Sequence, residues 1–181
     1  MRRALALCAA LAACGGADTT PLAPLLPSYR DPAVPIASKA DFDPARFVGT
    51  WREVASFPVP FQAGCAGATA TYGPRPDGAL SVRNVCLDAD GAERRAIEGE
   101  AVPTGPGRLR VTLEGVPFPA PLWVLWTDAD YRVAVLGQPD GRAGWILARD
   151  TPLRADLREA AERVLAFNGY DLTRLRDSPQ G

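Results

Sequence analysis

The sequence predicts an all-β fold with one helix: an eight-stranded up-and-down antiparallel β-barrel with a C-terminal α-helix packed on its outside. From Phe47 onward, about eight short strand patterns recur with turn signals between them, which is typical of a sandwich or a barrel. A meander of about eight strands can close on itself, which removes its edges and leaves room for one small ligand. After Arg149 the apolar residues change to helical spacing. We therefore expect one barrel domain with its helix over residues 41–181.

The first thirteen residues are expected to be a signal peptide and not part of this fold. Arg2 and Arg3 form a short positive segment, and residues 4–13 are a continuous apolar run. A membrane-spanning helix needs about 20 residues, so this run is too short to cross a bilayer.

The end of the apolar run resembles a lipidation signal. Leu11-Ala12-Ala13-Cys14 resembles the lipobox of bacterial lipoproteins, in which the cysteine becomes the lipidated N-terminus, whereas Cys8 follows a leucine that fits poorly before a cut. Proteins of that type resemble multiply acylated, palmitate-bearing lipoproteins, which stay on the membrane. Gly15 lacks the aspartate associated with inner-membrane retention, so the resemblance implies a lipid anchor in the cell outer membrane, on its periplasmic face. The alternative is a secretory signal in which Cys14 is incidental.

Residues 14–40 are interpreted as the lipidated N-terminus and an Ala/Pro-rich tether. The segment has neither strand nor helix periodicity, and its composition favours a semi-extended linker. The alternative is an ordered arm packed on the domain. Four apolar or aromatic residues support that alternative: Leu22, Leu25, Leu26 and Tyr29.

The first strand pattern follows Gly49, which permits a positive φ and a close approach by another segment. On this strand Trp51 and Glu53 share a face with every second residue up to Phe57. A large aromatic residue here can plug the end of a closed sheet, although an ordinary core tryptophan is the alternative. Strands are expected over residues 50–57, 65–72, 80–87, 93–102, 108–114, 122–127, 132–137 and 144–149.

Cys65 and Cys86 lie almost equidistant in sequence from the turn at Arg75-Pro76, so symmetric pairing of two strands would place them opposite each other. The distance across such a pair suits a disulfide, and an exported protein is in the right redox compartment. We expect a Cys65–Cys86 disulfide. Two free thiols or a metal site are the alternatives, and no histidine exists to complete a metal site.

A helix is expected after the last strand of the barrel. Its apolar positions recur at i, i+3, i+4, i+7 and i+8: Leu157, Ala160, Ala161, Val164 and Leu165. Thr151-Pro152 precedes this segment and Asn168-Gly169 ends it, in agreement with known start and stop signals. Residues 170–175 are expected to add a short final strand.

Composition excludes several classes of function. The chain has no histidine, which removes Ser-His-Asp triads, His-paired cysteine nucleophiles and His-ligated zinc or haem. The formal net charge of −1 gives no basic surface for nucleic acid. No phosphate-binding or dinucleotide-binding motif is present, so we expect no cofactor, no metal and no catalytic residues.

These motifs together resemble the lipocalin family, and specifically the bacterial outer-membrane lipocalin lipoproteins. The first family motif is Gly-x-Trp, here Gly49-Thr50-Trp51. The bacterial signature continues through Arg52-Glu53-Val54-Ala55, Pro60-Phe61-Gln62, Cys65, Ala70-Thr71-Tyr72 and Arg75-Pro76-Asp77-Gly78. The second motif is spread over residues 127–131, and the third is an arginine closing the eighth strand, here Arg149. The resemblance implies that Arg149 lies across Trp51 and closes one end of the barrel.

The chain departs from the family pattern in three places. Arg52 replaces the aromatic residue that usually follows the tryptophan, and the second motif carries an insertion. The segment at residues 116–121 is richer in proline than the family suggests, and we expect this departure to alter the rim of the pocket.

The resemblance implies a binding protein that stores or transports one hydrophobic ligand in the cell envelope, and the bacterial group suggests a lysophospholipid or a fatty acid. The expected cavity wall is aromatic, although filling of the barrel without ligand contact is the alternative for each residue: Phe57, Tyr72, Trp123, Trp126, Tyr131 and Trp145. Glu53 is an expected wall residue too, because it shares a face with Trp51, and a salt bridge with an arginine is the alternative to contact with a ligand head group.

Two other functions stay open at this point. One is an envelope structural or adaptor lipoprotein with a filled core, which would bind no lipid. The other is an enzyme on the same barrel, since a few lipocalins catalyse isomerisations with a free thiol or pocket acids. The orientation of the second strand is also open, because with its apolar face inward Arg83, opposite it, would sit inside the barrel.

Overall fold

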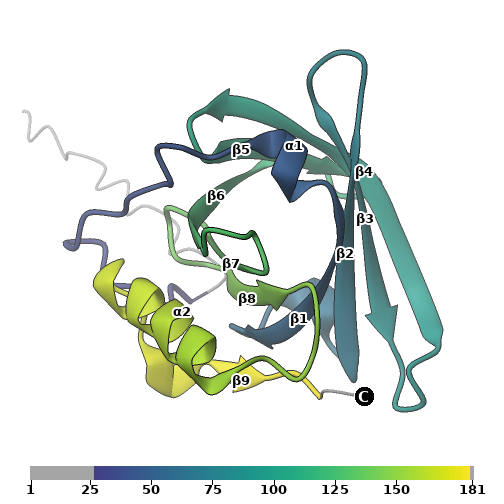
Figure 1. Cartoon of the computed structure of the whole chain (residues 1–181). Helices are drawn as coiled ribbons and strands as arrows, with labels where there is room; N and C mark the ends of the chain where they lie inside the picture. Colours follow the sequence, from purple (N-terminus) through teal and green to yellow (C-terminus); the bar gives the residue numbers. More distant parts are fainter. Residues whose placement is uncertain (1–26, 180–181) are drawn as a thin grey trace, which may run out of the picture.

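A computed structural model describes residues 27–179, and the expected signal peptide and Cys14 lie outside these residues. Antiparallel strands form one sheet in the order β2-β3-β4-β5-β6-β7-β8-β1-β9, and β1 also pairs with β2, which closes the first eight into a barrel (Figure 1). The strands are β1 (Gly49–Ser56), β2 (Gly67–Pro74), β3 (Leu80–Leu87), β4 (Glu93–Gly105), β5 (Arg108–Leu113), β6 (Ala120–Thr127), β7 (Val133–Gly137), β8 (Gly144–Ala148) and β9 (Arg176–Asp177). The expected barrel is confirmed.

The main helix, α2 (Ala155–Phe167), packs against β6 and β7 on the outside of the barrel, as expected. Three shorter helices were not expected: α1 (Pro44–Phe47), η1 (Pro60–Gln62) and η2 (Leu172–Arg174). The final strand was expected over residues 170–175, but η2 occupies much of this segment and β9 follows it. None of the helices in residues 27–179 has the length and hydropathy needed to cross a membrane.

Two apolar clusters divide the side chains between the inside and the outside of the barrel. The inner cluster joins Trp51, Tyr72, Leu122, Leu136 and Leu147 with neighbours from other strands. The outer cluster lies between the sheet and α2, and it contains Val133, Val135, Ile146, Ala161 and Leu165. Alternate residues of β7 and β8 therefore belong to different clusters, as the period of two requires.

A β-bulge in β1 changes which residues face the interior. The pairing of β1 with β8 shifts between Glu53 and Ala55, so Glu53 pairs with Leu147 of the inner cluster but Ala55 pairs with Ile146 of the outer one. A bulge inserts one extra residue, which reverses the faces of all residues beyond it. The expected common face of Trp51, Glu53, Ala55 and Phe57 is therefore wrong beyond Glu53.

The second strand presents its apolar face to the interior, and Arg83 is nevertheless outside. Tyr72 pairs with Val82, and Thr71 pairs with Arg83. Because Tyr72 and Val82 both belong to the inner cluster, Thr71 and Arg83 face outward. There Arg83 forms ion pairs with Glu93 and Glu98, which resolves the question left open by the sequence.

Residues 27–40 pack against the domain, which agrees with the ordered-arm alternative for this part of the expected tether. Buried Arg30 donates from Nε to the backbone oxygen of Asn168 at 3.1 Å and from Nη1 to that of Pro139 at 2.9 Å. Farther along, the N–H of Lys39 donates to the oxygen of Val124 at 2.8 Å. The arm thus holds the end of α2 and the edge of β6, and the packed domain begins before residue 41.

Cys65 and Cys86 form the expected disulfide, with a Cα–Cα distance of 5.2 Å. The two cysteines are not direct cross-strand partners, however, because Cys86 pairs with Ala68 and Cys65 lies in the loop before β2. The bond therefore fastens the β1–β2 loop to β3 at one end of the barrel.

Candidate functional site: the barrel cavity

The barrel encloses a cavity of about 650 Å³, a size that suits a small-molecule site. Its mouth is bordered by the β1–β2 loop, through residues 60–63, and by the β5–β6 loop, through Glu114, Val116 and Phe118. The opposite end contributes no lining residue from α1 or from the β6–β7 loop. The barrel is therefore open at one end and closed at the other.

The deep part of the cavity is apolar. Tyr72, Leu122, Leu136 and Leu147 line it and also belong to the inner cluster that continues to Trp51. Burial raises the pKa of the Tyr72 hydroxyl above its ordinary value, so the group is neutral in the physiological range. A hydrocarbon chain matches this wall, because burying apolar surface is favourable by about 25 cal/mol per Å².

The rim of the cavity combines apolar and charged side chains. Phe61, Val116 and Phe118 line the mouth while remaining exposed, Phe118 to 78%. The proline-rich segment at 116–121, which departs from the family pattern, therefore forms part of the rim. Arg95 and Glu114 supply the charged groups there.

A polar network crosses one wall of the cavity. Trp145 donates from Nε1 to the side-chain oxygen of Gln62 at 3.1 Å, and Gln62 donates in turn to the carboxylate of Glu53. The hydroxyl of Ser56 donates to the same carboxylate at 2.9 Å, and so does that of Ser178. The network holds η1 at the mouth against β1 and β8.

Three of the seven expected wall residues line the cavity: Glu53, Tyr72 and Trp145. Phe57 does not, because the β1 bulge turns it outward, where it packs between Tyr29 and Tyr170 with centroid distances of 5.1 and 5.0 Å. A second bulge, between Val124 and Trp126, turns Trp126 toward the outer cluster.

The other two expected wall residues lie elsewhere for different reasons. Trp123 points outward from β6, where the guanidinium of Arg108 lies 4.3 Å from the centroid of its ring. Tyr131 is in the β6–β7 loop at the closed end, where its hydroxyl accepts from the N–H of Asp43 at 2.8 Å. Two polar residues of the mouth, Gln62 and Arg95, were not predicted as site residues, because exposed polar residues near turns have solvent as their ordinary surroundings.

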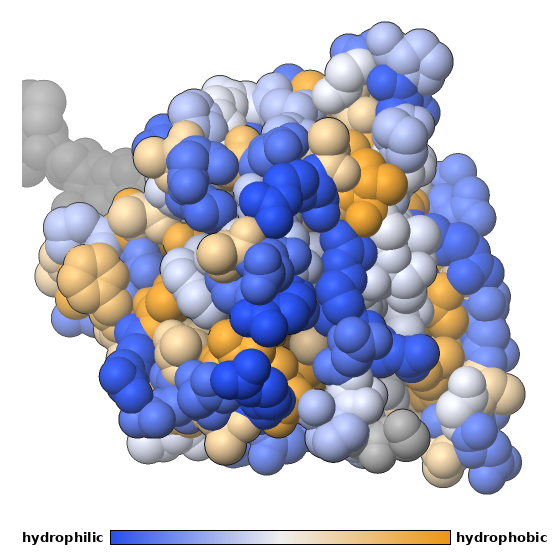
Figure 2. All heavy atoms as spheres, in the orientation of Figure 1, coloured by the Kyte–Doolittle hydropathy of each residue, from blue (hydrophilic) through white to orange (hydrophobic). Residues whose placement is uncertain are grey.

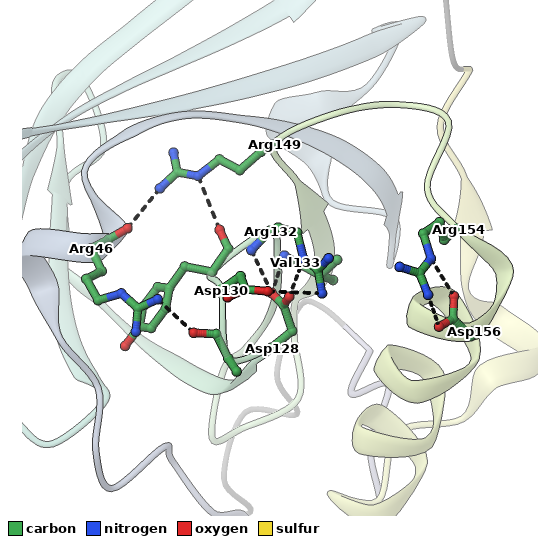
Figure 3. A network of polar contacts seen from close by, with 10 residues as sticks. Arg46, Asp128, Asp130, Arg132, Val133, Arg149, Arg154 and Asp156 are labelled. Carbon is green, nitrogen blue, oxygen red and sulfur yellow. Dashed lines mark hydrogen bonds and ion pairs between the residues drawn. The ribbon is translucent and has the colours of Figure 1, made fainter.

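The closed end is built around Trp51 and Arg149, as the family resemblance implied. Trp51 is fully buried, donates from Nε1 to the oxygen of Phe47 at 2.9 Å, and carries the Arg149 guanidinium 3.7 Å from its ring centroid. Arg149 also donates to the oxygens of Val48 at 2.8 Å and Thr50 at 3.1 Å, and its contact with the Arg46 oxygen is visible in Figure 3. Burial lowers the pKa of the Arg149 side chain.

Gly49 permits this close approach. It has a φ of +108°, and a Cβ at this position would lie 2.9 Å from Nη1 of Arg149. A side chain here would therefore meet both backbone strain and the guanidinium. Figure 2 shows this end of the molecule, with hydrophilic residues in a band over α1 and the neighbouring loops.

Asp128 organises the β6–β7 loop beside this closing pair (Figure 3). Its buried carboxylate accepts from the backbone N–H groups of Arg132 at 2.6 Å and Val133 at 2.9 Å, and from Nε of Arg132 at 2.7 Å. Burial alone would raise the pKa of Asp128, but these hydrogen bonds and the charge of Arg132 together lower it below its ordinary value.

We expect the change Asp128→Asn to lower the free energy of unfolding at pH 7 by about 1.5–3 kcal/mol, because hydrogen bonds to a buried charge are lost. A carboxyl group whose pKa is lowered by folding stabilises the protein above its unfolded pKa, near 3.9, and this contribution disappears as the pH falls through the folded pKa. Urea unfolding at pH 7 and at low pH measures the difference, which should shrink on acidification. A difference that stays constant with pH would contradict the assignment.

A family model for the lipocalin-like domain matches residues 42–180. The chain is a lipocalin. It is 35% identical to the outer membrane lipoprotein Blc of Escherichia coli strain K12 over 137 residues, which cover 74% of this chain and 77% of that protein. It is 34% identical to temperature-induced lipocalin-1 of Arabidopsis thaliana over 146 residues, or 75% and 77% of the two chains. Lipocalins typically bind small hydrophobic ligands.

Solved structures show the same fold at lower identity. Insecticyanin from Manduca sexta has a TM-score of 0.65 at 21% identity, covering 86% of this lipocalin and 88% of that chain. Lobster apocrustacyanin A1 has a TM-score of 0.63 at 21% identity, covering 86% and 93%. At this identity the similarity concerns the barrel architecture alone.

Proposed function

We propose that this lipocalin binds one single-chain lipid, a lysophospholipid or a fatty acid, inside its barrel and thereby stores or transports it. The observation that carries the proposal is the 650 Å³ cavity, apolar at depth and bordered by polar groups at its mouth. A hydrocarbon chain suits the deep wall of Tyr72, Leu122 and Leu147, and a polar head group suits the rim. The Cys65–Cys86 disulfide occupies the two thiols that a thiol-dependent enzymatic function would have needed.

The proposed place of this activity is the periplasmic face of the cell outer membrane, with the lipid anchor on Cys14. The lipobox-like segment before Cys14 supports it, and so does the name of the Blc relatives, which are outer membrane lipoproteins. The packed arm at residues 27–40 then leaves only residues 15–26 between the anchor and the domain.

Tryptophan fluorescence tests the binding proposal. Of the four tryptophans, only Trp145 lines the cavity. Trp123 and Trp126 pack on the outside of the barrel, and Trp51 is buried in the closed end. We expect saturable one-to-one binding to residues 15–181, the expected mature chain without the lipidated Cys14, with lysophospholipid or fatty acid kept below the micelle concentration. The change Trp145→Phe should remove most of the fluorescence response.

The matched control is Trp123→Phe, which removes a tryptophan of the outer face and should keep the response. Folding of each variant is checked by its near-ultraviolet circular dichroism and by the absence of free thiols. If folded protein saturates with neither lipid, the carrier function is wrong, and a filled-core adaptor becomes the better hypothesis. A response carried equally by Trp123 would place the ligand outside the barrel.

A further inference from the structure

Arg95 is a cation at the mouth of the cavity whose charge is not neutralised by any carboxylate among residues 27–179. It lies on β4, lines the cavity, and donates from Nη2 to the oxygens of Phe61 at 2.7 Å and Ala63 at 3.1 Å. Among the described residues no carboxylate pairs with it, and its Nε and Nη1 have no hydrogen-bond partner. The acids nearest in sequence on β4, Glu93 and Glu98, pair instead with Arg83 on the outward face.

The hydrogen bonds that Arg95 does make fix its position. Two of its acceptors, Phe61 and Ala63, belong to the β1–β2 loop, and the disulfide at Cys65 fastens the same loop to β3. The guanidinium is thus held at the rim by one nitrogen, while the others remain available for a ligand. A preorganised planar guanidinium suits carboxylate and phosphate oxygens, which it can contact through two parallel hydrogen bonds.

The other charged groups of the cavity do not compete for this role. The carboxylate of Glu53 accepts hydrogen bonds from Ser56, Gln62 and Ser178 on the β1 side of the barrel. Glu114 is on the exposed β5–β6 loop and forms no ion pair with Arg95. Because the deep wall is apolar and the mouth is charged, a single-chain lipid would enter with its hydrocarbon chain first and leave its head group at the rim.

We propose that Arg95 anchors an anionic group, a carboxylate or a phosphate, at the head of a single-chain lipid held in the cavity. This inference rests on the proposed function and adds to it the residue and the head-group chemistry. The anion would complete the hydrogen bonding of Nε and Nη1, and the hydrocarbon chain would fill the apolar depth. A neutral lipid of the same length would bind through its chain alone.

Affinities for three probes of equal chain length test this: a fatty acid, a lysophosphatidylglycerol and an uncharged monoacylglycerol, each titrated below its micelle concentration. In Arg95→Gln we expect the affinity for the anionic probes to fall about tenfold, while that for the monoacylglycerol stays unchanged. Arg95→Lys should recover part of the loss. A fall confined to the fatty acid assigns a carboxylate to the site, and one confined to the phospholipid assigns a phosphate.

Arg94 provides the matched control. It is the adjacent residue on β4, it also caps a carbonyl of the β1–β2 loop, that of Gly64 at 2.7 Å, and it does not line the cavity. Arg94→Gln should leave all three affinities unchanged. An equal loss for all three probes in Arg95→Gln, or the same losses in Arg94→Gln, would overturn the anchor. Failure of the unmodified protein to bind any of the three probes would overturn the proposed function itself.

Discussion

Replacing Trp51 with alanine is expected to lower the free energy of unfolding by about 3–5 kcal/mol, the range for deleting a large buried aromatic side chain. The indole is fully buried, it packs 5.0 Å from Phe47 between ring centroids, and its Nε1 satisfies the Phe47 oxygen at 2.9 Å. Its loss would also leave the Arg149 guanidinium without the ring on which it lies. Since a domain of this size is stable by only about 5–15 kcal/mol, much of its stability would be lost.

Urea unfolding followed by circular dichroism measures this loss. Trp123→Ala is the control, because it removes the same side chain from the half-buried outer face and should cost clearly less. Trp51→Phe should fall between alanine and the native protein, since it keeps an aromatic ring but cannot donate to Phe47. Equal losses for Trp51→Ala and Trp123→Ala would show that the closed end contributes no special stability.

The period of two in the sequence predicted the barrel but not all of its inward faces. Strand number, antiparallel order, the outer helix and the disulfide followed from turn residues and spacing. Phe57 and Trp126 were assigned to the cavity wrongly because each lies beyond a bulge, and one extra residue reverses a strand's faces. No residue type in the sequence marks where the ladder shifts, since a bulge depends on how neighbouring strands pair.

The polar residues at the mouth of the cavity could not be predicted from the sequence for another reason. Arg94 and Arg95 are consecutive, and only the strand's orientation decides which of the two faces the cavity. The register of β3 with β4 places Arg95 opposite Cys86, whose disulfide lies at the mouth. Glu53 and Trp145 could be predicted because they share a parity with Trp51 and Arg149, the closing pair that the family motif fixes.

A second large effect is expected from filling the cavity. Ala70 on β2 lines it, faces inward like Tyr72, and pairs with Trp51 of the closed end. The change Ala70→Trp would place an indole at the depth where the hydrocarbon chain is proposed to lie. If this excludes about 100 Å² of ligand surface, the loss at about 25 cal/mol per Å² is about 2.5 kcal/mol, or about 70-fold in Kd. Titration with a long-chain fatty acid measures it.

The control places the same indole outside the barrel. Thr112 on β5 is exposed and does not line the cavity, so Thr112→Trp should leave Kd unchanged. Chain length gives a second test, because a short fatty acid that does not reach the filled depth should lose less affinity in Ala70→Trp than a long one. Full affinity for the long chain in a folded Ala70→Trp protein would mean that the ligand does not enter the barrel. The variant can instead lose affinity for the long chain while short-chain probes still bind with the Arg95-dependent preference for anions. That result would place the hydrocarbon chain at the depth of the cavity and the head group at its rim.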